Sequence, residues 1–126
     1  MNYLLVAIGS AVGGMGRYLF SGLGARFVGE TFPWGTLFVN VTGSLLIGVL
    51  AVLVPADSRL LPNEARELLM IGLCGGFTTF SSFSLETLNL ARNGAWVPAV
   101  SYALGSVALC LIFVWIGYFG TAALTR

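Results

Sequence analysis

GLCGGFTTFSSFSLE, residues Gly72 to Glu86, stands inside a hydrophobic segment that is otherwise long enough to form one helix. The pair Gly75-Gly76 weakens a helix interior, and the β-branched pair Thr78-Thr79 adds side chains that are stiff in helices. Phenylalanines then alternate with hydroxyl side chains, an arrangement that a helix facing only lipid does not need. The stretch therefore predicts a helix that is broken near its middle and a polar site at membrane depth.

The composition predicts an integral membrane protein. Of the 126 residues, 57% are hydrophobic and 9% are charged, whereas soluble domains carry about 25% charged residues. The net charge of +1 offers no basic patch for nucleic acid, and the lack of histidine excludes a histidine-based metal or proton-relay site. The two cysteines, Cys74 and Cys110, are expected to be packing residues. No Lys or Arg precedes the first apolar run, so we expect that run to be kept as a span.

Four apolar segments are each close to the roughly 20 residues that a membrane-spanning helix needs. Their approximate limits are residues 3–23, 34–54, 67–91 and 96–123. The expected fold is therefore an all-α membrane protein, a single domain over residues 1–126 with four transmembrane helices and a break in the third. Small residues four apart should allow close helix packing in lipid, at Gly9–Gly13, Ser44–Gly48 and Ser101–Gly105.

The arginines are divided equally between the two sides of a chain with four spans. Arg59, Arg66 and Arg126 fall on the side of the N-terminus, and Arg17, Arg26 and Arg92 fall on the other. Because an asymmetry in Lys and Arg orients a membrane protein, this balance predicts insertion in both orientations. Two oppositely inserted copies can form an antiparallel, two-fold homodimer. One or two arginines can also decide an orientation, so a single orientation is the alternative.

Polar residues recur every four positions in two of the spans. Thr36, Asn40 and Ser44 share one face of the second span, and Tyr102, Ser106 and Cys110 share one face of the fourth. The Asn40 amide is costly in lipid without a partner. Taken alone, Asn40 fits a hydrogen bond between helices better than a pore lining, and the fourth-span stripe is also compatible with packing.

Phe80 and Phe83 lie three residues apart and so share a helix face. An aromatic ring is positive at its edge, so the two edges could approach a small anion while hydroxyls and an amide donate hydrogen bonds. Packing against lipid or the protein core is the alternative. It is weaker here because the two rings stand beside a glycine pair and a run of hydroxyls.

A helix that opens around Gly75 to Thr78 would leave carbonyl groups without partners. In lipid this is tolerated where the groups are buried, hydrated or bound to an ion. In an antiparallel dimer two such openings would meet near the two-fold axis, where oxygen ligands suit Na⁺. Arg17 could reach the membrane interface or make a vestibule attractive to anions. Glu86 could be a pore-mouth acid, a packing partner or a proton carrier.

Three motifs resemble the Fluc/CrcB family of fluoride channels. They are GGMGRY at Gly13–Tyr18, PWGTLFVNVTGS at Pro33–Ser44 and GLCGGFTTFSSFSLE at Gly72–Glu86. The resemblance covers nearly the whole chain, and the second and third motifs together are specific. It implies a channel, not an enzyme, that assembles as an antiparallel dual-topology homodimer with two fluoride pores.

The resemblance also implies roles for individual residues. Asn40 would line the pore, and the ring edges of Phe80 and Phe83 would contact fluoride. A polar track would continue through Thr36, Thr79, Ser81, Ser84, Tyr102 and Ser106. The carbonyls of Gly75 and Thr78 would hold a central structural Na⁺, and Arg17 matches the vestibule arginine of the family. Cys110 stands where some members carry serine, which leaves open how far the track extends.

The sequence is therefore interpreted as a passive channel that exports F⁻ across the cell membrane, inner or plasma. The alternative is a small dual-topology multidrug exporter coupled to protons. Such an exporter needs a membrane-embedded acid early in the chain, and the first two predicted spans contain neither Asp nor Glu. Glu86 is the remaining candidate, and its neutralisation should stop an exporter but leave a passive channel largely active. A non-transporting assembly subunit would leave the hydroxyl run unexplained.

Overall fold

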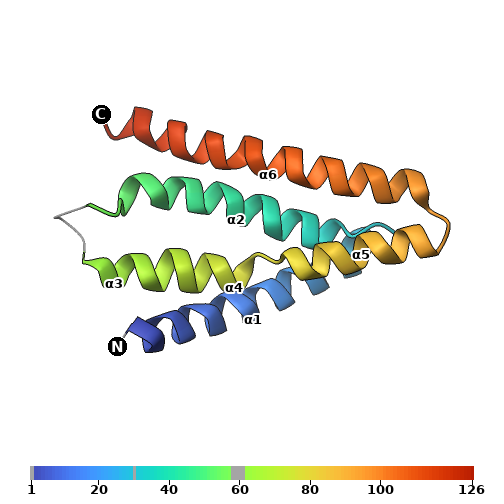
Figure 1. The fold of residues 1–126 in the computed structure, drawn as a ribbon, viewed down its shortest axis with the longest axis horizontal. Coiled ribbons are helices and arrows are strands. Elements are labelled where there is room, and N and C mark those ends of the chain that lie inside the picture. The colour runs from blue at the N-terminus through green and yellow to red at the C-terminus, as the bar shows by residue number, and fades with distance from the viewer. Residues whose placement is uncertain (1, 30, 58–61) are drawn as a thin grey trace.

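The computed structural model describes residues 2–29, 31–57 and 62–126, which are helical apart from short turns (Figure 1). In chain order the helices are α1 (Asn2–Val28), α2 (Trp34–Leu53), α3 (Asn63–Arg66), the π-helix η1 (Glu67–Cys74), α4 (Gly75–Phe77), α5 (Phe80–Arg92) and α6 (Trp96–Leu124). They form one elongated bundle with both ends of the chain at the same end of it (Figure 1). The prediction of an all-α fold is confirmed for the described residues.

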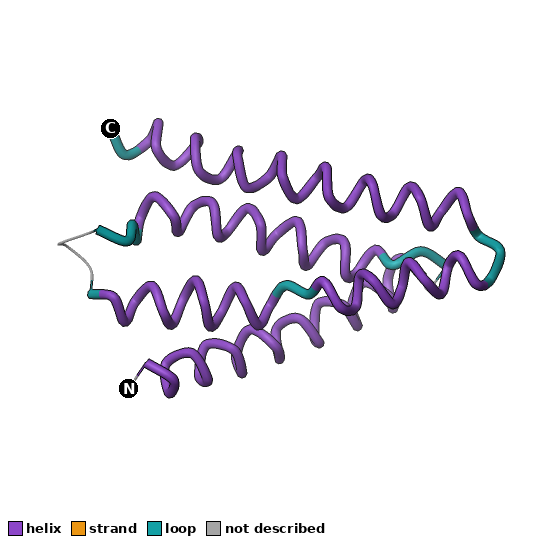
Figure 2. The backbone as a smooth tube through the Cα atoms, viewed as in Figure 1, coloured by secondary structure: helices purple, strands orange, loops and turns teal. Residues whose placement is uncertain are grey.

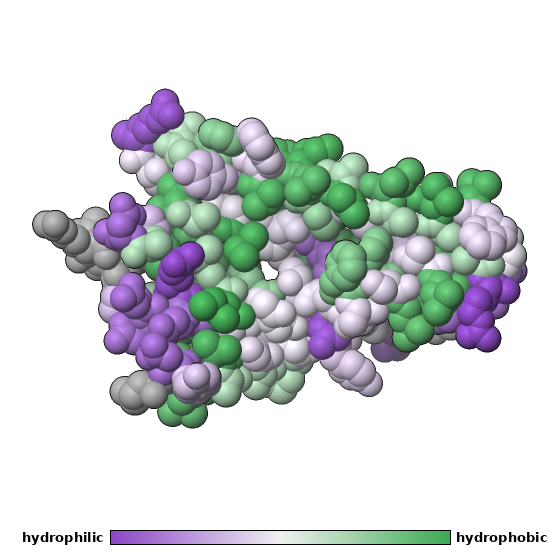
Figure 3. Space-filling view, in the orientation of Figure 1, coloured by the Kyte–Doolittle hydropathy of each residue, from purple (hydrophilic) through white to green (hydrophobic). Residues whose placement is uncertain are grey.

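Four helical segments are long and apolar enough to cross a membrane: Asn2–Val28, Trp34–Leu53, Asn63–Arg92 and Trp96–Leu124. On the face seen in Figure 3, hydrophilic residues gather toward the two ends of the bundle and hydrophobic residues cover most of the length between them. This distribution matches a multi-pass membrane protein. Arg59, which the predicted charge balance used, lies outside the described residues.

The first helix extends beyond the predicted limit of the first span at residue 23. Gly24 lies inside the helix and packs against α2. A Cβ atom on Gly24 would lie 2.6 Å from the Gly35 Cα, so this glycine serves a close contact and does not end the helix. The helix ends instead at Val28 and is followed by Gly29, whose φ of +100° is readily available only to glycine.

Glycines allow α1 to pack directly on the backbone of the third membrane-long segment. A Cβ on Gly13 would overlap the Leu73 carbonyl and lie 2.8 Å from the Phe77 nitrogen. A Cβ on Gly76 would lie 2.6 Å from the Ser10 oxygen. The predicted close contact at Gly9–Gly13 is therefore confirmed, and Gly76 is required for packing rather than for a break.

The contact between α2 and α6 uses Gly48 from one predicted small-residue pair and does not use Gly105 from the other. A Cβ on Gly48 would overlap the Val114 carbonyl, and one on Gly117 would lie 3.1 Å from the Val49 nitrogen. By contrast, a Cβ on Gly105 meets nothing within 4 Å in the described chain. The prediction that Ser101–Gly105 mediates close packing is therefore wrong within a single chain, because α6 approaches α2 through Gly117.

The third membrane-long segment changes conformation along its length. It begins with α3 and the π-helix η1, and it returns to α-helix for Gly75–Phe77. Thr78 (φ −83°, ψ 155°) and Thr79 (φ −149°, ψ 122°) then have extended backbones, and α5 starts at Phe80 (Figure 2). We call Thr78–Thr79 the connecting segment.

The extended residues overlap the predicted opening around Gly75 to Thr78 only at its last residue, Thr78. Gly75 itself is helical, with φ −63° and ψ −38°. Gly76 is held against Ser10 of α1, so the glycine pair stays within regular helix. The change of direction falls on the two threonines that follow.

We expect Gly13→Ala to destabilise the protein and Gly14→Ala not to. A methyl group added at position 13 would collide with the backbone at Leu73 and Phe77, whereas a Cβ on Gly14 meets nothing within 4 Å. Overpacking of this kind costs about 1–3 kcal/mol, while Gly→Ala in an open helical position is favourable by up to about 1 kcal/mol. Thermal unfolding of the two variants in the same detergent measures the difference. Equal unfolding midpoints would show that α1 is not held at this distance.

Candidate functional site

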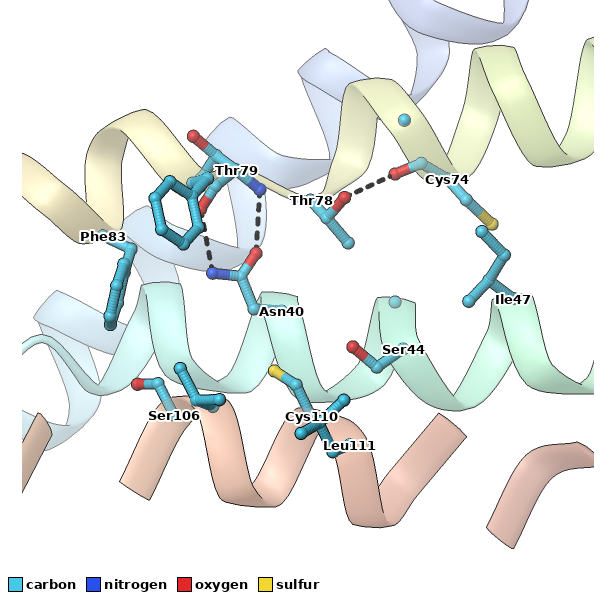
Figure 4. Close-up of a pocket in the computed structure, with 14 residues that line it drawn as sticks. Asn40, Ser44, Ile47, Cys74, Thr78, Thr79, Phe83, Ser106, Cys110 and Leu111 are labelled. Carbon is cyan, nitrogen blue, oxygen red and sulfur yellow. Dashed lines mark hydrogen bonds between the residues drawn. The ribbon is translucent and has the colours of Figure 1, made fainter. Parts of the chain in front are cut away.

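A cavity of about 350 Å³ lies between α2, the connecting segment and α6 (Figure 4). Of the residues predicted for a polar pore, it contains Asn40, Thr79, Phe80, Phe83 and Ser106. Gly75 and Thr78, whose carbonyls were expected to hold a cation, also line it. The cavity therefore gathers donors and aromatic rings from three separate parts of the chain.

Other predicted site residues do not line this cavity. They are Thr36, Ser81, Ser84, Tyr102 and Arg17. Sequence reasoning, in turn, missed Gly43 and Cys74 as lining residues and treated Ser44 and Cys110 only as members of polar stripes. The position of Gly43, three residues after Asn40 and so on the same helical face, was the available signal.

The side chain of Asn40 bonds to the backbone of the connecting segment. Its Nδ2 donates to the Thr79 carbonyl at 2.9 Å, and its Oδ1 accepts from the Thr79 N–H at 2.8 Å (Figure 4). Both groups of Thr79 point to the same side because the residue is extended, much as in a hydrogen-bonded pair of β-strands. The amide thus supplies partners that helical bonding would have supplied. The second N–H of Asn40 has no acceptor among the described residues, so it could donate to a ligand.

Thr78 is held by its own helix. Its backbone N–H donates to the Cys74 carbonyl at 3.0 Å, and its Oγ1 donates to the same oxygen at 2.9 Å. These two bonds fix the orientation of the Thr78 side chain as well as its backbone.

The start of α5 is capped by Thr79. The Thr79 Oγ1 accepts from the Ser82 N–H at 3.2 Å and lies 3.2 Å from the Ser81 Oγ. One turn on, the Ser84 Oγ donates to the Phe80 carbonyl at 2.9 Å. The hydroxyl run therefore serves first to cap this helix, and Ser81 and Ser84 are exposed on the isolated chain.

Arg17 approaches the end of α4. Its Nε donates to the Gly76 carbonyl at 3.3 Å, and the side chain is partly buried. A carbonyl at a helix C-terminus lacks an intrahelical donor and carries partial negative charge, so a guanidinium is favourable there.

The carbonyls of Gly75 and Thr78 differ from that of Gly76, because none of the described residues donates a hydrogen bond to them. Gly75 is exposed on the isolated chain and Thr78 is partly exposed. Two backbone oxygens of this kind, three positions apart in sequence, are ligands suited to a hard cation, so the residues present fit the expected Na⁺. Two oxygens are too few to complete a coordination shell on their own.

The two phenylalanines contact each other but differ in exposure. Their ring centroids are 5.2 Å apart at an interplanar angle of 46°. Phe83 is 9% exposed and also packs on Tyr102 at 5.2 Å, whereas Phe80 is 75% exposed. Phe83 is therefore positioned by the core of the chain, whereas most of the Phe80 side chain is left uncovered by the described residues.

Glu86 is bound by two hydroxyls from different helices. The Thr36 Oγ1 on α2 donates to its Oε1 at 2.7 Å, and the Tyr102 hydroxyl on α6 donates to its Oε2 at 2.6 Å. Thr36 and Tyr102 are both buried. Of the roles considered for Glu86, this geometry supports a packing partner that ties α5 to its two neighbours.

Ser106 is 5% exposed, and its Oγ has no hydrogen-bond partner among the described residues. A buried polar group without a partner costs about 1–3 kcal/mol. Since this residue lines the cavity, a water molecule or an ion there would satisfy its hydroxyl.

The similarity to known proteins extends over nearly the whole chain. The family model described as "CrcB-like protein, Camphor Resistance (CrcB)" matches residues 4–118. The fluoride-specific ion channel FluC of Paramagnetospirillum magneticum is 50% identical and aligns over 100% of this chain and 99% of its own length. Proteins of the same name from Opitutus terrae and Rhodospirillum rubrum are 51% and 48% identical, over 97% and 100% of this chain and 93% and 98% of their own lengths.

Proposed function

Because this chain belongs to the CrcB-like family, we propose that it is a passive channel through which F⁻ leaves the cell down its gradient. The observation that carries the proposal is the end-to-end match, at 50% identity, to a protein named a fluoride-specific ion channel. A channel of this kind is not an enzyme. It would lie in the cell membrane, which its four apolar helices are long enough to cross.

The functional unit in this proposal is an antiparallel homodimer with two pores. The third span, broken at the connecting segment, would face the same segment of the second copy across the two-fold axis. Phe80 and Gly75 are both exposed, so the aromatic and polar groups there are uncovered on one side of the cavity. This exposure supports the proposed arrangement. The balanced arginines of the sequence support insertion in both orientations.

Fluoride in the pore would be held by neutral donors. The ion is small and strongly hydrated, so a pore must replace its water without a fixed positive charge that would trap it. Such donors are the ring edges of Phe80 and Phe83, the second N–H of Asn40 and the hydroxyl of Ser106, the last two having no partner within the described part of the chain. Their weak and distributed binding allows the ion to leave as well as enter.

The outer parts of the route would use the remaining predicted residues. The hydroxyls of Thr79 and Ser81 would extend the donor set at the start of α5. The hydroxyls of Ser84, Thr36 and Tyr102 donate to the Phe80 carbonyl and to Glu86, so each would have to turn toward the ion in order to contribute to the track. Arg17 would raise the local concentration of anions at a vestibule. Its bond to the Gly76 carbonyl keeps the charge beside the connecting segment, outside the cavity.

A structural Na⁺ would lie at the centre of the dimer. The Gly75 and Thr78 carbonyls of both copies would provide four oxygens, which is why one copy alone is insufficient. The ion would supply fixed positive charge that holds the two connecting segments together.

The proton-coupled exporter is not favoured. Glu86, the acid that the sequence analysis considered for such an exporter, accepts hydrogen bonds from two hydroxyls through both of its oxygens. An acid that alternates between a proton and a drug needs a face open to both.

The proposal is tested by loading liposomes that contain the purified protein with KF, adding the K⁺ ionophore valinomycin so that K⁺ can follow the anion, and measuring efflux with a fluoride electrode. Vesicles loaded with KCl are measured in the same way with a chloride electrode. We expect rapid F⁻ efflux without a pH gradient, and far slower efflux from matched vesicles loaded with KCl. Efflux that needs a proton gradient, or that is equal for Cl⁻, would contradict a passive fluoride channel.

We expect Phe80→Ile and Phe83→Ile each to reduce F⁻ efflux, because isoleucine is apolar like phenylalanine but has no positive ring edge. A lost contact worth about 1.4 kcal/mol at the barrier lowers the rate about tenfold. Size-exclusion chromatography should still show the dimer. Leu85→Ile, at an exposed position on the same helix, is the control. Normal efflux from both phenylalanine variants would remove the rings from the ion path.

We expect Asn40→Asp to abolish most efflux. Aspartate can still accept from the Thr79 N–H, but it loses the donor to the Thr79 carbonyl and adds a negative charge beside that oxygen. The charge also repels F⁻ within the cavity. Asn89→Asp, on an exposed face of α5, controls for the charge alone. If Asn40→Asp conducts normally, Asn40 serves only to join the helices.

A further inference from the structure

Two residues on one face of α2 each meet one residue of the connecting segment. Asn40 binds the backbone of Thr79 through both amide atoms. Gly43, three positions further along the same face, lies against Thr78. Each of the two extended residues of the third span is therefore contacted by one residue of the second span.

Gly43 leaves no space for a side chain. A Cβ atom there would overlap the Thr78 Cγ2 methyl, while its next neighbours are the Phe77 Cδ1 at 3.3 Å and the Thr78 Cβ at 3.7 Å. At 3.3 Å the ring atom would have to give by a few tenths of an ångström, and 3.7 Å is an ordinary contact. The Thr78 methyl is thus the one atom that makes glycine necessary.

The Thr78 methyl cannot move away by itself. The Thr78 Oγ1, on the same Cβ as the methyl, and the Thr78 backbone N–H both donate to the Cys74 carbonyl. With both bonds in place, the chirality of threonine sets where the methyl points (Figure 4). Displacing the methyl would break one of these bonds or shift the Thr78 backbone, including its carbonyl.

We propose that Asn40 and Gly43 form a template on α2 that sets the conformation of the connecting segment, and that Gly43 is a positioning residue for the carbonyl of Thr78. Asn40 attracts Thr79 by replacing its helical hydrogen bonds, and Gly43 admits the Thr78 methyl. Together they make the extended form of these residues favourable in lipid, where an unpartnered backbone group is costly. The inference deepens the proposed function and rests on it, because the Thr78 carbonyl is one of the oxygens assigned to Na⁺.

The test combines Gly43→Ala with Thr78→Ser. Serine lacks the Cγ2 methyl but keeps the hydroxyl that donates to Cys74, so it removes the collision without removing the bond. We expect Gly43→Ala to lower the thermal unfolding midpoint by about 5 °C or more and the double variant to regain most of that loss. The Na⁺ concentration needed for half-maximal thermal protection should rise about tenfold in Gly43→Ala and fall back in the double variant. F⁻ efflux should follow the same order.

Gly48→Ala provides the matched control on the same helix. Its Cβ would collide with the Val114 backbone on α6, so it also destabilises, but the Thr78 methyl has no part in that collision. Thr78→Ser should therefore not rescue Gly48→Ala.

Three results would overturn the inference: wild-type behaviour of Gly43→Ala, a double variant that is as impaired as Gly43→Ala, or equal rescue of Gly48→Ala by Thr78→Ser. A Gly43→Ala protein that fails to fold while the double variant folds supports it. Failure of the proposed function is recognised separately, since wild-type protein would then show no F⁻ efflux while the unfolding midpoints still report on the template.

Discussion

The need to satisfy every backbone N–H and C=O away from water governs the centre of this molecule. An extended pair of residues inside a hydrophobic span would be prohibitively costly without replacement partners. Here the replacements come from Asn40 for Thr79, from Arg17 for Gly76 and from the hydroxyl of Thr79 for the start of α5. Among the described groups, no donor bonds to the carbonyls of Gly75 and Thr78. These two oxygens without a hydrogen bond make the segment suitable for a cation.

Close packing of helix backbones makes those replacements reachable. The side chain of Asn40 is short, so it can bond the Thr79 backbone only if α2 and the connecting segment lie near each other. Glycine at position 43 allows this approach, and Gly13 and Gly76 bring α1 equally close on another side. In this chain the small residues thus determine the distances between helices, and the polar residues form their hydrogen bonds across those distances.

One wall of the cavity is supported by the core of the chain, whereas other lining residues are exposed. Phe83 is fixed by its contact with Tyr102, and Tyr102 is fixed by Glu86, so one wall is rigid. Phe80 and Gly75, on the other side, are exposed. A second copy would cover this side and contribute further oxygens, which connects the proposed pores, the proposed Na⁺ and the antiparallel dimer through one surface.

The sequence by itself determined the membrane class, the four apolar helices and the family, because hydrophobic length and local motifs need no tertiary contact to be read. It also placed Asn40, Phe80, Phe83 and Ser106 among the site residues, and these line one cavity. Only the tertiary structure decided that the extended residues are Thr78 and Thr79 while Gly75 stays helical, that Glu86 is bound by Thr36 and Tyr102, and that Gly43 lies against the Thr78 methyl. The reason is that each of these depends on which side chain of one helix reaches the backbone or side chain of another, and such distances between helices are not encoded in the spacing along any one of them.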